Sequence, residues 1–108
     1  MQSPPLTPAV FHVLLALAAE DRHGYAIMRD AEARSGGKFR MGPGTLYGTI
    51  KRLLEAGLVE EAGPCDEDER RRLYRLTERG RGALAEEVSR LDLLLRHPSA
   101  VRILRRGA

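Results

Sequence analysis

The chain has 108 residues, of which 43% are hydrophobic and 31% are charged, and its formal net charge is +3. This length fits one domain, and so high an apolar content with so small a net charge excludes an intrinsically disordered chain. The longest apolar run, Ala9 to Ala19, is interrupted by His12, and it is too short for the roughly 20 residues of a membrane span.

Cysteine usage and the N-terminus favour a cytoplasmic protein. The single cysteine, Cys65, cannot form an internal disulfide, which suits the reducing cytosol. Met1 to Pro5 lack the basic start of a secretion signal. Acidic neighbours, Asp66 to Asp68, disfavour a thiolate, so we do not expect Cys65 to act as a redox sensor.

Two helices are expected in the first third of the chain. Thr7 followed by Pro8 is typical of a helix start, and the helix to Ala19 is apolar on nearly every side. Such a helix packs against several elements or against a second subunit. After a loop, a second helix is predicted over Gly24 to Ser35, ended by Gly36 and Gly37.

A third helix, Gly44 to Ala56, has a clear amphipathic pattern. Leu46, Ile50 and Leu53 recur at helical spacing on one face. The opposite face carries Gly44, Gly48, Lys51, Arg52 and Glu55, flanked by Thr45 and Tyr47.

A hairpin and a long helix follow. Residues 58–62 and 70–76 are predicted strands around a polar turn, 63–69. Thr77 is a natural N-cap for a helix to Arg96. The seam of that helix is Leu84, Val88, Leu91 and Leu95, at heptad spacing. Beyond Pro98, residues 99–106 form one more basic turn or are disordered.

This order predicts a mainly α fold with a small two-stranded β wing: a winged helix-turn-helix plus one long C-terminal helix. We expect three parts, a DNA-binding domain over residues 1–77, a dimerisation helix over 78–97 and a basic tail over 98–108.

The outward face of the third helix favours contact with double-stranded DNA. Two glycines let another backbone approach closely, and Lys51 and Arg52 can neutralise phosphates. Thr45 and Tyr47 lie near the end that such helices insert into the major groove. The alternative is an ordinary amphipathic helix with a solvated polar face.

The wing and the start of the second helix are further candidates. Arg70, Arg71 and Arg72 either grip phosphates or compensate the acidic run before them. Tyr25, at a helix start that could bind phosphate, is either a contact or a half-buried tyrosine.

No catalytic site, metal site or cofactor is predicted. His12, His23 and His97 share no metal-ligand spacing with each other or with Cys65. No phosphate-binding loop is present, and no nucleophile with its base can be identified. Carboxylate pairs occur only in charged runs, which are typical of a solvated face.

The long helix is expected to form a homodimer, alone or together with the first helix. The predicted interface residues are Val10, Phe11, Leu14, Leu84, Val88, Leu91 and Leu95. A two-fold dimer would place two third helices roughly 34 Å apart and read an inverted repeat.

Four segments together resemble the PadR-type transcriptional regulators. They are Leu6 to Val10, His23 to Ile27, Gly42 to Tyr47 followed by Lys51 to Leu53, and Glu69 to Thr77. The resemblance covers about residues 6–96. It implies a bacterial cytoplasmic homodimer that represses transcription, with DNA contacts from the third helix, the wing arginines and Tyr25.

The resemblance also implies that the C-terminal helix dimerises, as in the small subgroup that has one such helix. Some small members bind flat aromatic compounds between paired tryptophans of that helix. This chain has no Trp, which argues against aromatic stacking and leaves two alternatives: a small apolar effector near Val88 and Leu91, or no small-molecule effector. The alternative function is a winged-helix module that binds protein through its basic tail without specific DNA binding; an enzyme has the least support.

Overall fold

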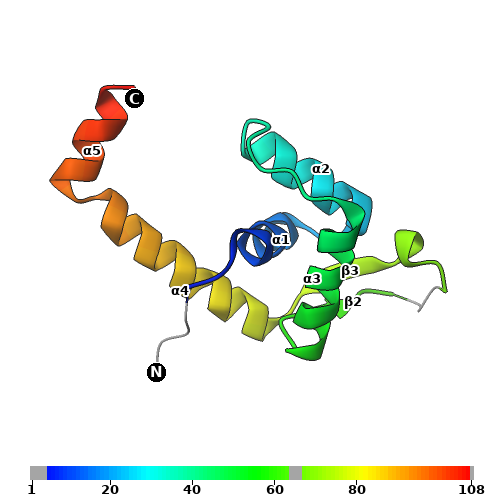
Figure 1. Ribbon diagram of the computed structural model, residues 1–108. Coiled ribbons are helices and arrows are strands. Elements are labelled where there is room, and N and C mark those ends of the chain that lie inside the picture. Colours follow the sequence, from blue (N-terminus) through cyan, green and yellow to red (C-terminus); the bar gives the residue numbers. More distant parts are fainter. Residues whose placement is uncertain (1–4, 64–66, 108) are drawn as a thin grey trace.

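The computed structural model describes residues 5–63 and 67–107. In chain order the elements are α1 (Pro8–Ala19), β1 (Arg22–His23), α2 (Gly24–Arg34), α3 (Pro43–Glu55), β2 (Val59–Glu61), the 3₁₀ turn η1 (Glu69–Arg71), β3 (Leu73–Leu76), α4 (Glu78–Leu95) and α5 (Pro98–Arg105). The expected mainly α winged helix-turn-helix with a long C-terminal helix is confirmed (Figure 1).

Helix α1 is the centre of the core. The Thr7 hydroxyl accepts a hydrogen bond from the Val10 N–H at 3.3 Å and caps the helix. Helices α2, α3 and α4 all pack on α1 (Figure 1). The residues of α1 that this packing buries are Val13, Leu14, Ala16 and Leu17. Burial on several sides explains why α1 is apolar nearly all round.

The wing sheet has three strands where the sequence predicted two. Strand β3 pairs antiparallel with β2 on one edge and with β1 on the other. The extra strand, β1, aligns Arg22 with Tyr74 and His23 with Leu73. The prediction of a loop there was wrong because a two-residue strand has no local signature and depends on its distant partner.

The predicted wing strands are also shorter in the structure. Residues 69–71 form η1 instead of the start of a strand, and β3 begins at Leu73. The Asp68 carboxylate accepts a hydrogen bond from the Arg70 N–H at 3.0 Å, which favours a turn over an extended chain here.

Helix α4 has two different halves. The first half packs on α1 and β3, and Gly80 lies so close to Leu58 that an added Cβ would be 2.0 Å from the Leu58 carbonyl oxygen. The second half projects away from the core and leads to α5 at the far end of the molecule (Figure 1). The radius of gyration is accordingly 15.2 Å, against about 13 Å for a compact chain of this size.

The last segment is helical. Of the two alternatives for residues 99–106, the structure has the helical one, α5, whose first turn is capped by the His97 ring, which accepts from the Ser99 N–H at 3.2 Å. No residue of α5 is buried. Among the residues that the structure describes, no helix combines the length and apolar character needed to cross a membrane.

Candidate nucleic-acid interface

The outward face of α3 is open to a partner. Leu46, Thr49, Ile50 and Leu53 turn inward and are buried. On the opposite face Gly44, Thr45, Lys51 and Arg52 are exposed and Gly48 is half-buried. Neither Lys51 nor Arg52 has a carboxylate of residues 5–63 and 67–107 within ion-pair distance; Arg52 instead donates to the Thr49 hydroxyl at 3.5 Å.

Internal packing does not require glycine at Gly44 or Gly48. A Cβ added at either position would have no heavy atom of a neighbouring segment within 4 Å, in the part of the chain that the structure describes. Both residues lie in a helix, where glycine is roughly 1 kcal/mol less favourable than alanine. The space therefore lies outside the fold, where a partner could approach the helix backbone closely.

Tyr47 has a structural role that the sequence did not indicate. A Cβ added at Gly24 would lie 2.7 Å from the Tyr47 hydroxyl oxygen. The ring therefore packs on the start of α2 and is half-buried. Of the two flanking residues predicted to reach bases, Thr45 is the exposed one.

Tyr25 and Arg29 form an exposed pair on the first turns of α2. Tyr25 is 60% exposed. The guanidinium of Arg29 lies 5.7 Å from the Tyr25 ring centroid and is 3.5 Å from its hydroxyl. His23, directly before this helix, contacts the wing instead, with its Nδ1 at 3.1 Å from the Arg72 carbonyl oxygen.

The wing arginines are paired with carboxylates. Arg70 and Arg71 lie 3.2 Å and 3.9 Å from Asp68. Arg72 lies 3.5 Å from Glu61 on the neighbouring strand. The alternative of local charge compensation thus describes the unbound chain. Arg70 and Arg71 remain largely exposed, so they can exchange Asp68 for another anion.

The pairing shifts the pKa values of Asp68 and Arg70. Hydrogen bonds from the side chain and backbone of Arg70 hold the pKa of the Asp68 carboxyl below its ordinary value. The same hydrogen bond raises the pKa of the Arg70 guanidinium. Cys65 and Asp66, singled out in the sequence, lie outside the described residues.

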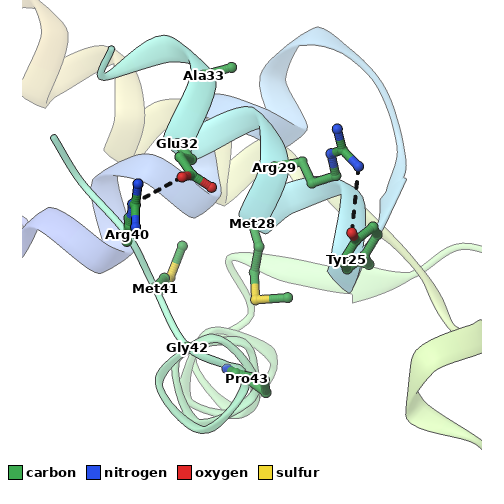
Figure 2. Close-up of a pocket in the computed structure, with 9 residues that line it drawn as sticks. All are labelled: Tyr25, Met28, Arg29, Glu32, Ala33, Arg40, Met41, Gly42 and Pro43. Atoms are coloured by element: carbon green, nitrogen blue, oxygen red, sulfur yellow. Dashed lines mark hydrogen bonds and ion pairs between the residues drawn. The ribbon is translucent and has the colours of Figure 1, made fainter. Parts of the chain in front are cut away.

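A groove beside α3 brings together residues that the sequence analysis missed. It has a volume of about 650 Å³ and lies between α2 and the connector before α3 (Figure 2). Arg29 and Arg40 are at its rim, and Met28 and Met41 line it. Arg29 follows Tyr25 by four residues and so shares its helix face, which is the signal that could have found it.

The residues predicted for a dimer interface fall into two groups. Leu14 and Leu84 are buried in the chain's own core, so neither is available to a second copy. Val10, Phe11 and Leu91 are half-buried, whereas Val88 and Leu95 are exposed. Further apolar side chains are exposed on α4 and α5: Leu93, Leu94, Ile103 and Leu104.

Within residues 5–63 and 67–107, no three side chains of His, Cys, Asp or Glu gather closely enough to hold a metal ion.

Known proteins share both the sequence and this architecture. The model of the transcriptional regulator PadR-like family matches residues 13–86. The chain is 36% identical over 85 residues to the transcriptional regulator Rv3488 of Mycobacterium tuberculosis. This alignment covers 79% of this chain and 77% of that protein. It is 45% identical over 76 residues to an uncharacterized 37.1 kDa protein in transposon TN4556 of Streptomyces fradiae. That alignment covers 70% of this chain but only 21% of the Streptomyces protein.

A solved structure of another protein has a similar fold. RosR of H. salinarum superposes with a TM-score of 0.69 at 27% sequence identity, over 94% of this chain and 88% of that one. The chain therefore belongs to the PadR-like family of transcriptional regulators.

Proposed function

We propose that this protein binds a double-stranded DNA operator sequence-specifically through α3 and represses transcription by occupying a promoter. The observation that carries the proposal is the outward face of α3. It combines two glycines that no internal contact requires with two cations that no described carboxylate neutralises. Such a face suits the major groove, where a recognition helix must approach closely and meets phosphates on both sides.

Some of these residues would contribute affinity through phosphate contacts, and others would contribute specificity through contacts with bases. Lys51 and Arg52 would contact phosphates and set the register of the helix. Exposed Thr45, near the start of α3, would contact base edges. Tyr25 would donate its hydroxyl to a phosphate, and the wing arginines would exchange their carboxylate partners for phosphates.

A homodimer is part of the proposal, with residues 1–77 as the DNA-binding unit and 78–97 as the dimerisation helix. The apolar side chains exposed on the second half of α4 and on α5 support it, because contiguous apolar surface on a small chain marks an interface. Val10, Phe11, Val88, Leu91 and Leu95 would face the second copy. The dimer would read an inverted repeat, and a small apolar effector near Val88 and Leu91 would release it from DNA by favouring another spacing of the two α3 helices.

The test of DNA binding is fluorescence anisotropy with duplex DNA from the upstream region of the protein's own gene. A scrambled duplex is the control, and salt is stepped from about 50 to 200 mM. We expect binding at least about a thousandfold tighter to the native duplex. No binding to either duplex at low salt would contradict the proposal and favour a module that binds protein. Leu91→Asp tests the dimer: light scattering should show monomers, and an unchanged dimer would refute the interface.

A further inference from the structure

The groove beside α3 has the composition of a surface that lies along a polyanion. It runs along α2 from Tyr25 to Ala33, with Arg40 to Pro43 forming its other wall (Figure 2). Met41 is buried and Met28 is half-buried, so flexible thioethers line the groove between the polar groups of the rim. Figure 2 shows Arg29 and Arg40 at separate places along it.

The charges of the rim favour an anion. Arg29 has no ion pair with any side chain that the structure describes, and its guanidinium contacts the ring and hydroxyl of Tyr25. Arg40 lies 3.0 Å from Glu32 and is 77% exposed. The Glu32 carboxylate therefore neutralises one of the two arginines and leaves the groove with one uncompensated positive charge.

The groove is continuous with the face of α3. Tyr25 lines the wall formed by α2. Pro43, which is the residue before Gly44, lines the opposite wall. A duplex with its major groove on α3 would thus carry one of its backbones past this groove.

We propose that the groove holds a sugar-phosphate strand of the bound duplex, with Arg29 and Arg40 on phosphates and the half-buried Met28 side chain against the deoxyribose. This inference rests on the proposed function and adds a second row of backbone contacts to it, away from the wing. Phosphate contacts carry no sequence information. The groove therefore contributes affinity and salt dependence equally on any duplex.

Glu32 weakens the binding of DNA because it pairs with Arg40 in the free protein. Its carboxylate holds Arg40 and would face the incoming phosphate. Replacing it by glutamine removes the repulsion and releases Arg40. Glu32→Gln should therefore bind both specific and scrambled duplexes more tightly than the wild type, by about threefold, as expected when an exposed ion pair no longer competes for Arg40.

The experiment measures anisotropy of Arg29→Ala and Arg40→Ala with upstream and scrambled duplexes across the same salt range. Each variant should lower affinity for both duplexes by the same factor. Each should also reduce the slope of log K against log salt by about 0.9, as for one lost phosphate contact. Arg29→Lys and Arg40→Lys keep the charge and should keep the slope.

Arg34→Ala is the matched control, because Arg34 lies on the same helix and is paired with Asp30 but does not line the groove. It should leave affinity and slope unchanged. If Arg29→Ala and Arg40→Ala behave like Arg34→Ala while the wild type binds, the groove assignment is wrong and the proposed function stands. If these variants change the base preference and leave the salt slope unchanged, the groove assignment is also wrong. A wild type that binds neither duplex removes both.

Discussion

Helix α3 and the wing both carry positive charges, but these charges are paired differently. The α3 cations, Lys51 and Arg52, have no carboxylate partner in the part of the chain that the structure describes. The wing cations all have one: Arg70 and Arg71 with Asp68, Arg72 with Glu61, and Arg75 with Glu60. A count of basic residues would favour the wing as the site that contacts an anion, whereas the pairing of those charges in the structure favours α3.

The difference matters for binding energy. A phosphate that meets Lys51 gains an interaction, whereas one that meets Arg70 replaces an interaction already present. Exposed ion pairs are weak because both ions stay solvated, so the exchange at the wing is feasible but yields less. We therefore expect α3 to dominate affinity and the wing to modulate it.

The largest effect is expected from Gly48→Ala. The added methyl group would have no heavy-atom neighbour within 4 Å among the described residues, so helix stability should rise by about 1 kcal/mol. The same methyl would hold the DNA away, and affinity should fall on the order of 10- to 100-fold, as for overpacking of 1–3 kcal/mol. Thermal melting and anisotropy measure the two effects. Gly82→Ala, on α4 with equally open space, should stabilise without weakening binding; equal binding by both variants would contradict the α3 interface.

The double variant Lys51→Ala and Arg52→Ala comes next. It should weaken operator binding about tenfold at 100 mM salt and reduce the salt slope by about 1.8, because two phosphate contacts are lost. The comparison is Arg70→Ala with Arg71→Ala, for which we expect only a two- to threefold loss, since those side chains first have to leave Asp68. Equal losses from the two double variants would break the ranking.

Asp68→Asn tests the wing from the opposite direction. Removing the carboxylate frees Arg70 and Arg71 and takes a negative charge away from the DNA. We expect binding about twofold to threefold tighter, with a salt slope increased by up to about 0.9. Unchanged binding would mean that the wing arginines do not contact DNA. Glu86→Gln, at an exposed position on α4, controls for a general loss of negative charge.

The smallest effect is a titration. The carboxyl of Asp68 should titrate below its ordinary pKa because Arg70 hydrogen-bonds to the charged form. The ion pair is therefore complete above the ordinary aspartate pKa and is lost as pH falls through the lowered value. NMR of the carboxyl carbon should show the pKa rise in Arg70→Ala. An unchanged value would mean that the pair does not persist in solution.

The sequence was informative where structure is local. Helix caps at Thr7 and Thr77 located α1 and α4, and the spacing of Leu46, Ile50 and Leu53 located α3. Two distant contacts escaped it. Strand β1 exists through pairing with β3, and Tyr47 packs on Gly24 of another helix. Neither leaves a periodic signal.

Sequence alone determined the order of elements, the apolar α1 and the glycine-bearing face of α3, because propensity and periodicity act over a few residues. The tertiary structure alone decided which charges are available. It placed Asp68 and Glu61 against wing arginines and left Lys51 and Arg52 without such partners. It also brought Arg29 and Arg40 to one groove from two segments. Coulomb attraction depends on distance in space, which turns and strand pairing set and residue counts do not.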